Sequence, residues 1–320
     1  MKTFTGAVLS LFFGLFLICF AFAARPKAQI SSQESGRKAV LVELFTSEGC
    51  SSCPPADGLL RRLQEQQPVA GAEVIALEEH VDYWNRDGWS DPFSSPEWTE
   101  RQLEYGTKFK NDAYTPQMVV DGRSQFVGNS SRGAELEIAK AARAEKTEVA
   151  ITSAKADASS SQRFTVSVGK LTGNADGDVA EVWLAVAEDG LHSSVSAGEN
   201  AGRVLRHIST LRSLHKIGVA GAGPVSFTGN PVIEFQSHWD PAKLRVLVFV
   251  QKKKSREILG AASTSIKGQA RQLTISAADA SAPASVFPSA RLEPALDERS
   301  VCSVYTCVRL HCRYRLSRAG

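Results

Sequence analysis

The pattern of apolar and polar positions changes near residue 148. Between residues 38 and 147, apolar runs of strand length alternate with stretches whose apolar positions recur every three or four residues, as in a helix that faces a core. The predicted elements are strands at 39–45 and 73–77, helices from Pro54 and over 96–110, a hairpin within 114–128 and a helix up to Lys146. Strand, helix and strand in succession predict a parallel βαβ unit with a right-handed connection.

Residues 148–266 predict a different architecture. Apolar or alternating runs of strand length follow one another without a strong helical pattern between them, at 149–152, 163–168, 179–186, 232–235 and 244–250. Short strands separated by turn residues are typical of an antiparallel sandwich. The segment 203–217 fits a strand and a helix equally well. We therefore predict an α/β domain at 38–147 and an all-β sandwich-like domain at 148–266.

Both ends of the chain differ from this globular body. Lys2 precedes an apolar run that ends in Ala21-Phe-Ala, so residues 1–24 are predicted to be a cleaved signal peptide and 25–37 a disordered leader. An uncleaved anchor is the alternative, although a full span needs about 20 apolar residues. Residues 267–320 are rich in Ala, Ser and Pro and then basic, which predicts a low-complexity, disordered linker and tail. We expect a secreted or periplasmic protein.

Charge and cysteine usage narrow the choice of partners. The formal net charge is +3, and residues 291–320 alone carry six Arg against three acids, so the rest of the chain is close to neutral. Because a domain that binds nucleic acid presents a basic face, we expect no nucleic-acid partner. Cys302, Cys307 and Cys312 form neither a CxxC pair nor the ligand spacing of a zinc site, and we assign this tail no function.

The candidate chemistry lies at Cys50-Ser-Ser-Cys53, where the first strand gives way to the first helix. The N–H groups at a helix start carry a partial positive charge, which favours a thiolate at Cys50 over its thiol. In such settings the pKa of a CxxC thiol is roughly 3.5 to 7.5, compared with about 8.5 for free cysteine. Cys53 can then attack a mixed disulfide formed at Cys50. The motif therefore predicts thiol–disulfide exchange.

Several sequence blocks carry a family resemblance. The element order, with CxxC after the first strand and Thr115-Pro116 before the third, resembles the thioredoxin fold, in which that proline is cis and faces the cysteines. More closely, the chain is similar to a secreted bacterial family, domain of unknown function 1223, in the blocks at 45–57, 80–84, 114–122 and 199–203. The resemblance implies an α/β thioredoxin-like domain ahead of the sandwich-like one.

Five residues around the motif are candidate substrate-binding positions. The resemblance implies that the backbone at Thr115 and Pro116 holds a substrate strand. The loop after the second strand is polar and rich in aromatic residues, and it adds His80, Asp82 and Trp84. Tryptophan offers a rigid amphipathic surface, which suits a substrate platform, although such residues also close protein cores.

Two features depart from familiar thioredoxins. Those proteins often have a buried acid, six residues before the first cysteine, that acts as a proton acceptor. Here Glu43 lies seven residues before Cys50 and is our candidate for that role. The residues between the cysteines are Ser-Ser rather than Gly-Pro, so the analogy gives no redox potential.

Three functions fit these observations. The first is an exported thiol–disulfide oxidoreductase with catalytic Cys50 and Cys53, which acts on exported proteins or small thiols and draws on a membrane or periplasmic reductase. It needs no cofactor, because two cysteines store both electrons. The second is a copper- or zinc-binding, metallochaperone-like module that uses Cys50, Cys53 and His80, since two thiolates and an imidazole suit those ions. The third is a non-catalytic binding protein in which the CxxC disulfide is structural.

Overall fold

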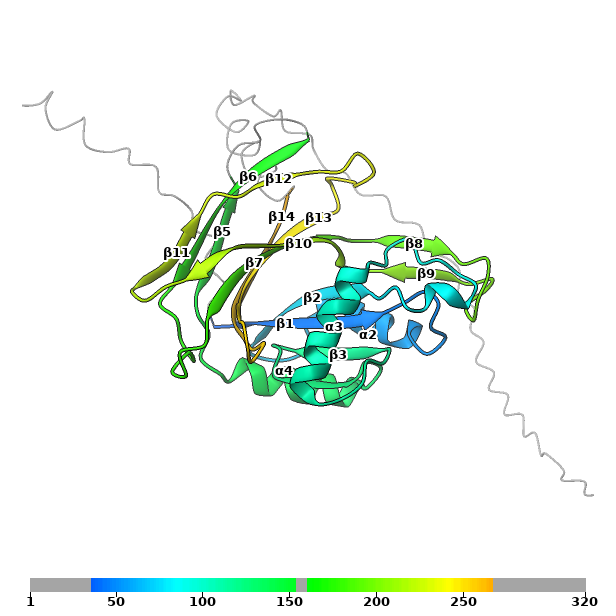
Figure 1. The fold of residues 1–320 in the computed structure, drawn as a ribbon, viewed down its shortest axis with the longest axis horizontal. Helices are drawn as coiled ribbons and strands as arrows, with labels where there is room; N and C mark the ends of the chain where they lie inside the picture. The colour runs from blue at the N-terminus through cyan, green and yellow to red at the C-terminus, as the bar shows by residue number, and fades with distance from the viewer. Residues whose placement is uncertain (1–35, 154–159, 267–320) are drawn as a thin grey trace, which may run out of the picture. The chain divides into compact units, whose positions relative to one another are not determined.

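An eight-stranded mixed sheet is the central feature of the computed structural model, which describes residues 36–153 and 160–266 (Figure 1). Neighbouring strands follow the order β14, β13, β7, β10, β2, β1, β3, β4. In that order the strands span Ile258–Ser265, Leu244–Lys252, Ala180–Glu188, Thr210–Ala220, Ala72–His80, Lys38–Thr46, Gln117–Val120 and Ser124–Val127. The pairing of Thr210 on β10 with Glu78 on β2 joins the early strands to the late ones.

Strands β1 and β2 lie in the middle of the sheet and are buried along almost their whole length. They are parallel, with Leu44 opposite Glu78 and Thr46 opposite His80. Parallel strands covered on both faces are expected to be continuously apolar, which explains the run at 39–45. Polar side chains in such strands are therefore placed in the interior of the molecule.

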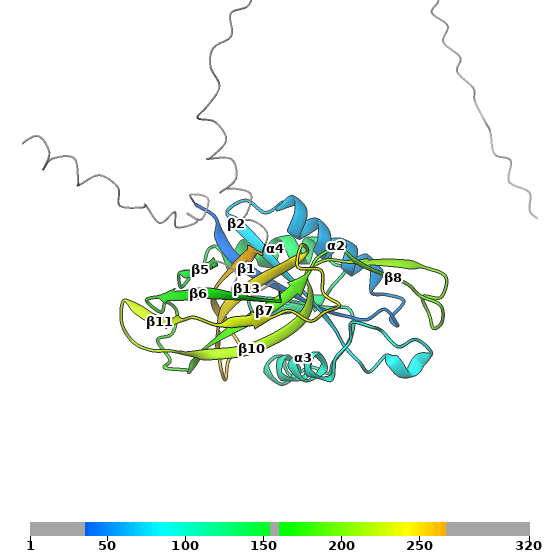
Figure 2. The same cartoon turned by 90° about the horizontal axis from the view of Figure 1, so that it is seen from above.

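Three α-helices cover the two faces of this sheet in the part of the chain that the structure describes. α2 (Pro54–Gln66) and α4 (Ser131–Ala142) pack on one face and α3 (Pro96–Phe109) on the other, and a short 3-10 helix, η1 (Asn85–Asp87), precedes α3 (Figure 2). Side chains alternate between the faces along a strand. Leu44 accordingly packs with α2, whereas Glu43 is bonded to α3.

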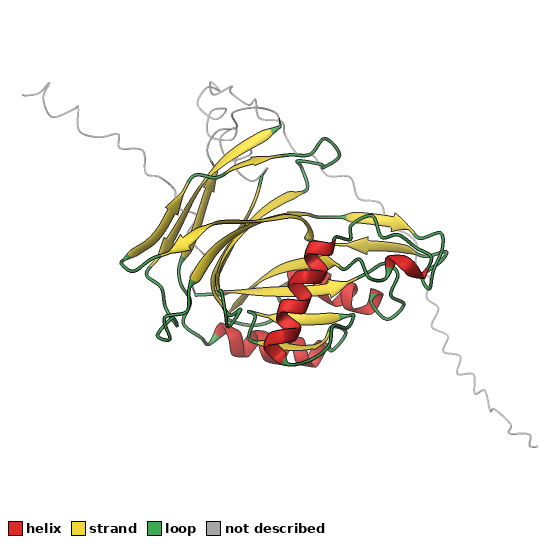
Figure 3. Cartoon of the chain, in the orientation of Figure 1, coloured by secondary structure: helices red, strands yellow, loops and turns green. Residues whose placement is uncertain are grey.

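A second, smaller sheet packs on the late strands of the large one. It contains β11 (Val225–Gly229), β6 (Ser161–Gly169) and β12 (Val232–Glu234), and β5 (Val149–Ser153) pairs with β6. Buried side chains such as Phe164 lie in one apolar cluster with residues of β7 and β13. Figure 3 shows that this part of the described chain consists of strands and loops.

A two-stranded hairpin leaves the large sheet between β7 and β10. Its strands are β8 (Leu191–Ser194) and β9 (Val204–His207), and we call residues 191–207 the arm. The arm extends toward the start of α2, and β9 contacts that helix (Figure 1). The undecided segment 203–217 is thus β9 followed by most of β10.

The predicted fold class, an α/β thioredoxin-like domain followed by an all-β sandwich-like domain, is wrong. The described chain is mostly β, and its eight-stranded mixed sheet combines strands from both predicted domains with three α-helices. The physical reason is the pairing of β2 with β10, whose contacting residues lie 132 positions apart. Local periodicity does not encode such a pairing.

Some predictions concern residues outside the described ranges. These are the signal peptide at 1–24, most of the leader at 25–37 and the cysteine-containing tail within 267–320. The described residues belong to one compact unit, and the domain boundary near residue 148 stays a prediction. None of the described helices is long and apolar enough to span a membrane.

Candidate functional site

Cys50 and Cys53 form a disulfide at the junction of β1 and α2. Cys53 is the residue immediately before the helix, and Pro54 begins it. Both cysteines are fully buried, whereas Ser51 and Ser52 between them are exposed. The CxxC motif therefore lies at the strand-to-helix junction that the sequence predicted, with its sulfur atoms covered and its serines at the surface.

The start of α2 offers fewer free donors than we expected. Pro54 and Pro55 have no N–H group, and the N–H groups of Ala56 and Asp57 donate to the carbonyl oxygen of Cys53 at 2.8 and 3.1 Å. The positive potential that we expected from unpaired N–H groups at the start of the helix is therefore smaller here.

The arm covers the disulfide loop. The fully buried Asn200 donates through Nδ2 to the carbonyl oxygens of Glu48 at 2.8 Å and Cys50 at 2.9 Å. The carboxylate of Glu199 accepts a hydrogen bond from the N–H group of Ser51 at 3.1 Å, and hydrogen bonding to the side chain and then the backbone of Ser51 lowers the pKa of Glu199. The loop is thus fastened to a segment that lies 150 positions later in the chain.

Trp84 and Thr115, two of the predicted substrate-binding residues, lie together beside this loop. Trp84 Nε1 donates to Thr115 Oγ1 at 2.8 Å. Gly49, next to the first cysteine, packs so tightly on Trp84 that a β-carbon at this position would lie 3.0 Å from Trp84 Cβ. Trp84 therefore packs against the disulfide loop at Gly49 through its backbone and β-carbon.

Pro116 also lies at the site, whereas Asp82 serves another part of the fold. The Thr115–Pro116 peptide bond is cis, as the resemblance implied. A β-carbon at Gly128 would lie 3.1 Å from Pro116 Cβ and 3.2 Å from Ala56 Cβ, so the proline is close to the first turn of α2. Asp82 instead accepts a hydrogen bond from Thr99 on α3 at 2.6 Å.

Glu43, the candidate proton acceptor, has other partners. Its carboxylate accepts hydrogen bonds from Arg101 Nε at 2.8 Å and from the Tyr105 hydroxyl at 2.6 Å, both on α3. The alternation along β1 places it on the face of the sheet opposite α2. A buried carboxyl near the cysteines is that of Asp57, in the first turn of α2, which accepts a hydrogen bond from Thr46 Oγ1 at 2.7 Å.

His80 belongs to a buried group of side chains that we call the histidine–carboxylate cluster: Glu48, Glu78, His80, Asp91 and His207. His80 Nδ1 lies 2.7 Å from Asp91 Oδ2. His207 reaches in from the arm, with Nδ1 at 3.2 Å from Glu78 Oε1 and Nε2 at 3.0 Å from Glu48 Oε1. The two imidazole rings meet edge to face with centroids 4.6 Å apart.

Burial and mutual charge shift the pKa values in this region. Burial, followed by the charge of Glu78, raises the pKa of Asp57 to about 7. Burial alone would raise the pKa of Glu78, but the charge of His207 and its hydrogen bond lower it to about 2. Burial would lower the pKa of His207, yet Glu78 and Glu48 raise it to about 9, and Asp91 and Glu78 likewise raise that of His80.

Sequence reasoning identified only His80 of this cluster. Glu78 lies at the end of a predicted buried strand, where a charged residue is a signal of a buried partner. His207 lay in the segment that we left undecided, so nothing local connected it with β2. The sequence predicted a metal site made of Cys50, Cys53 and His80. In the described residues, the two sulfur atoms are bonded to each other, and the potential metal ligands that lie near His80 are Glu78 and His207.

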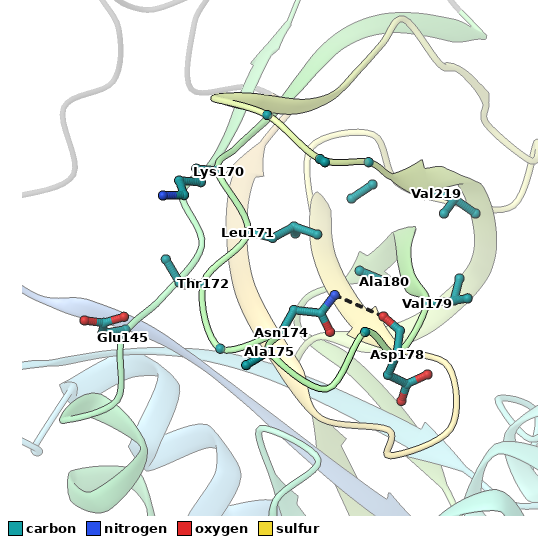
Figure 4. Close-up of a pocket in the computed structure, with 16 residues that line it drawn as sticks. Glu145, Lys170, Leu171, Thr172, Asn174, Ala175, Asp178, Val179, Ala180 and Val219 are labelled. Carbon is teal, nitrogen blue, oxygen red and sulfur yellow. Dashed lines mark hydrogen bonds between the residues drawn. The ribbon is translucent and has the colours of Figure 1, made fainter.

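A separate groove of about 730 Å³ lies away from the disulfide, between the loop at 170–179 and residues 219–223 (Figure 4). Its lining is largely backbone and small apolar side chains, and Asn174 Nδ2 donates to the carbonyl oxygen of Asp178 at 3.0 Å. No cluster of acid, base or nucleophile converges there, so we place the candidate site at the disulfide and the neighbouring cluster.

The fold and site define a class: a mostly β protein in which a hairpin arm closes over a disulfide at a strand–helix junction. The chain belongs to the family described as Protein of unknown function (DUF1223), whose model matches residues 41–251. This match confirms the resemblance to domain of unknown function 1223 that the sequence blocks indicated.

Several solved structures are similar to this chain. An X-ray structure of a protein from Agrobacterium tumefaciens has 25% sequence identity and a TM-score of 0.55, over 74% of this chain and 98% of that one. HBP35 of Porphyromonas gingivalis shares the fold at 16% identity and a TM-score of 0.54, over 80% of this chain and 82% of its own. Among curated proteins, no sequence matches this chain significantly.

Proposed function

We propose that this chain is an exported thiol–disulfide exchange protein that acts on protein or small-molecule thiols through Cys50 and Cys53. The observation that carries the proposal is a disulfide with two intervening residues at the N-terminus of α2. A bond that closes so short a loop restrains the unfolded chain by only about 2 kcal/mol in the chain-entropy treatment. Structural stabilisation is therefore a weak reason for its presence.

The proposed reaction transfers two electrons. A substrate thiolate attacks Cys50 Sγ, the Cys50–Cys53 bond breaks, and Cys53 leaves as a thiolate that takes up a proton. A second substrate thiolate then attacks the substrate sulfur of the mixed disulfide and releases Cys50. The substrate dithiol becomes a disulfide, and the protein disulfide becomes a dithiol. In the reverse direction, the same steps reduce a substrate disulfide, and a membrane or periplasmic reductase then has to restore the dithiol.

Access to the sulfur atoms requires a local opening, because both cysteines are fully buried. The loop that holds them is fastened from outside by the side chains of Asn200 and Glu199 on the arm. Hydrogen bonds contribute about 0.5–1.5 kcal/mol each in folded proteins, so these three bonds add about 1.5–4.5 kcal/mol to the cost of opening the loop. We propose that Trp84 and Thr115 then border the opened site.

Trapping tests the proposal directly. The Cys53→Ala variant, expressed in the compartment to which the chain is exported, should accumulate mixed disulfides through Cys50, because the thiol that resolves them is missing. A variant with both cysteines replaced by alanine is the matched control and should carry none. If Cys50 in the Cys53→Ala variant is free, reacts with an alkylating reagent and yet holds no adduct, the exchange proposal is wrong.

A second candidate is a binding protein with an inert disulfide, and the complete burial of both cysteines favours it. Reduction by a small dithiol separates the two candidates. An exchange protein should be reduced reversibly while it stays folded, whereas an inert bond should open only after the chain is denatured.

A further inference from the structure

We infer that Glu78, His80 and His207 form a binding site for a divalent first-row transition-metal ion, with zinc as the best match. One nitrogen or oxygen atom from each of these three side chains lies within 4.8 Å of the others, and all three residues are buried. Glu78 and His80 come from one face of β2, and His207 comes from the end of β9 on the arm. Closure of the arm therefore completes the set.

One atom of the cluster lacks a partner. His80 Nε2 is buried and makes no hydrogen bond, and Glu78 Oε2 lies 3.8 Å from it. Buried polar atoms are satisfied in the large majority of cases, so an exception calls for an explanation. An ion placed between this nitrogen and Glu78 would supply the missing interaction.

The other ring nitrogens are held as in known metal sites. His80 Nδ1 faces Asp91 at 2.7 Å, and His207 Nε2 faces Glu48 at 3.0 Å. Histidine ligands commonly bond a carboxylate through the nitrogen that does not bind the metal, which fixes the ring orientation. Both histidines have this arrangement, and it leaves His80 Nε2 and His207 Nδ1 directed at Glu78.

Spacing and donor type favour zinc. Two ligand atoms about 2.1 Å from a tetrahedral ion lie about 3.4 Å apart. The separations here are 3.8 Å from His80 Nε2 to Glu78 Oε2 and 3.2 Å from His207 Nδ1 to Glu78 Oε1, each to a different oxygen of the carboxylate. With one ligand atom from each residue, the three atoms lie within 4.8 Å of one another, so a small inward shift of the side chains brings them to the spacing of a zinc site. Two imidazoles and one carboxylate leave a fourth position open, as in catalytic zinc sites, and imidazole donors suit zinc better than they suit calcium or magnesium.

The charges agree with this assignment. Glu48, Glu78 and Asp91 supply three negative charges to a region with almost no solvent. Without an ion, the raised pKa values of His80 and His207 make both imidazoles cationic, and they offset two of these charges. A divalent cation with two neutral imidazoles supplies the same two positive charges, so the ion can replace the two protons without changing the charge balance of the buried carboxylates. The site uses no thiolate, so it is distinct from a site built on Cys50 and Cys53 and is independent of the exchange proposal.

The test uses the full chain with its disulfide intact. Protein stripped of metal by a chelator is incubated with Zn²⁺ or Co²⁺, both as folded and after refolding in the presence of the ion, and then dialysed. We expect one ion per chain, measured by elemental analysis. With Co²⁺ we expect visible absorption of a four- or five-coordinate site with nitrogen and oxygen ligands, without a sulfur-to-cobalt charge-transfer band.

Matched variants locate the site. His80→Gln and His207→Gln should weaken binding at least about 100-fold, since each removes a ligand, and Asp91→Asn should weaken it about 10- to 100-fold. His192→Gln changes an exposed histidine on the same arm and should bind like the parent. Replacement of both cysteines by serine should also leave binding unchanged.

Two results would overturn the assignment. One is a parent protein with a native circular dichroism spectrum that retains no zinc or cobalt after both loading procedures. The other is binding that persists in folded His80→Gln and His207→Gln variants, or that disappears when the cysteines are replaced, which would place the ion elsewhere.

Discussion

Replacement of Asn200 by alanine tests whether the arm controls access to the disulfide. The side chain is fully buried and donates to the carbonyl oxygens of Glu48 and Cys50. Alanine removes both donors and little else, because the remaining contact of the amide, with Arg203, lies within the arm itself. The substitution should therefore loosen the arm over the CxxC loop.

The size of the effect follows from the two carbonyl groups. In the variant, the carbonyl oxygen of Cys50 still accepts a hydrogen bond from the N–H group of Cys53 at 3.2 Å. The loss of the Asn200 donor at this oxygen therefore costs only an ordinary hydrogen bond, about 0.5–1.5 kcal/mol. The oxygen of Glu48 loses its donor in a buried position, which costs about 1–3 kcal/mol. Together the two losses amount to about 1.5–4.5 kcal/mol. A value of about 2 kcal/mol, near the lower end of this range, corresponds to an arm that opens about 30 times more often, at about 1.4 kcal/mol per factor of ten.

The assay is the rate of reduction of the folded protein by a small dithiol, followed by alkylation and mass analysis. If reduction proceeds through arm opening, Asn200→Ala should be reduced about 30-fold faster. Asn174→Ala is the control. It also removes a hydrogen bond from an amide to a carbonyl oxygen, but Asn174 lies in the separate groove, whose lining contains no residue of the arm or of the disulfide loop (Figure 4). A variant whose free energy of unfolding falls by about 2 kcal/mol while its reduction rate changes less than threefold would refute the gating role of the arm.

Two further substitutions test buried contacts outside the candidate site. Lys146→Met leaves the buried Asp121 carboxylate without its ion-pair partner and should cost about 3–5 kcal/mol at pH 7.5. Burial raises the pKa of Asp121 even though Lys146 opposes this, and without Lys146 the pKa should rise further. As pH falls below that raised pKa, Asp121 in the folded variant takes up a proton and no longer needs a cation, so the loss of stability should shrink. Urea unfolding at pH 7.5 and 4.5 measures the loss, and an equal loss at both would contradict the assignment. Gly260→Ala places a β-carbon 2.0 Å from the Thr147 carbonyl oxygen, so the backbone must move and the free energy of unfolding should fall by about 3 kcal/mol; an unchanged urea midpoint would refute this.

Features set by neighbouring residues could be predicted from the sequence. The strand, the loop and the helix around Cys50 and Cys53 occur as expected, and β3 and β4 form the hairpin that Asp121-Gly122 indicated. Asp121 and Gly122 both have positive φ there, which Asp and Gly tolerate better than most residues.

Features that depend on distant segments could not be predicted in the same way. Glu43 was offered as a proton acceptor from its spacing to Cys50 alone, but its partner, Arg101, lies 58 positions later, and spacing carries no information on such a pair. The histidine–carboxylate cluster is likewise assembled when the arm brings His207 within reach of Glu78, 129 positions away. A sequence pattern gives the type of each element, whereas the strand order decides which side chains meet.

The arm links the two proposals, because it carries both Asn200 and His207. An ion bound by His207 and the β2 residues would hold the base of the arm closed, and an open arm would lack one ligand. The two equilibria are thermodynamically linked. If the open arm binds the ion more weakly than the closed arm by some factor, the bound ion lowers the equilibrium constant for arm opening by the same factor. Zinc should therefore slow reduction of the disulfide in the parent protein and have no effect in His207→Gln. Equal reduction rates with and without bound zinc would show that the disulfide is reached without movement of His207.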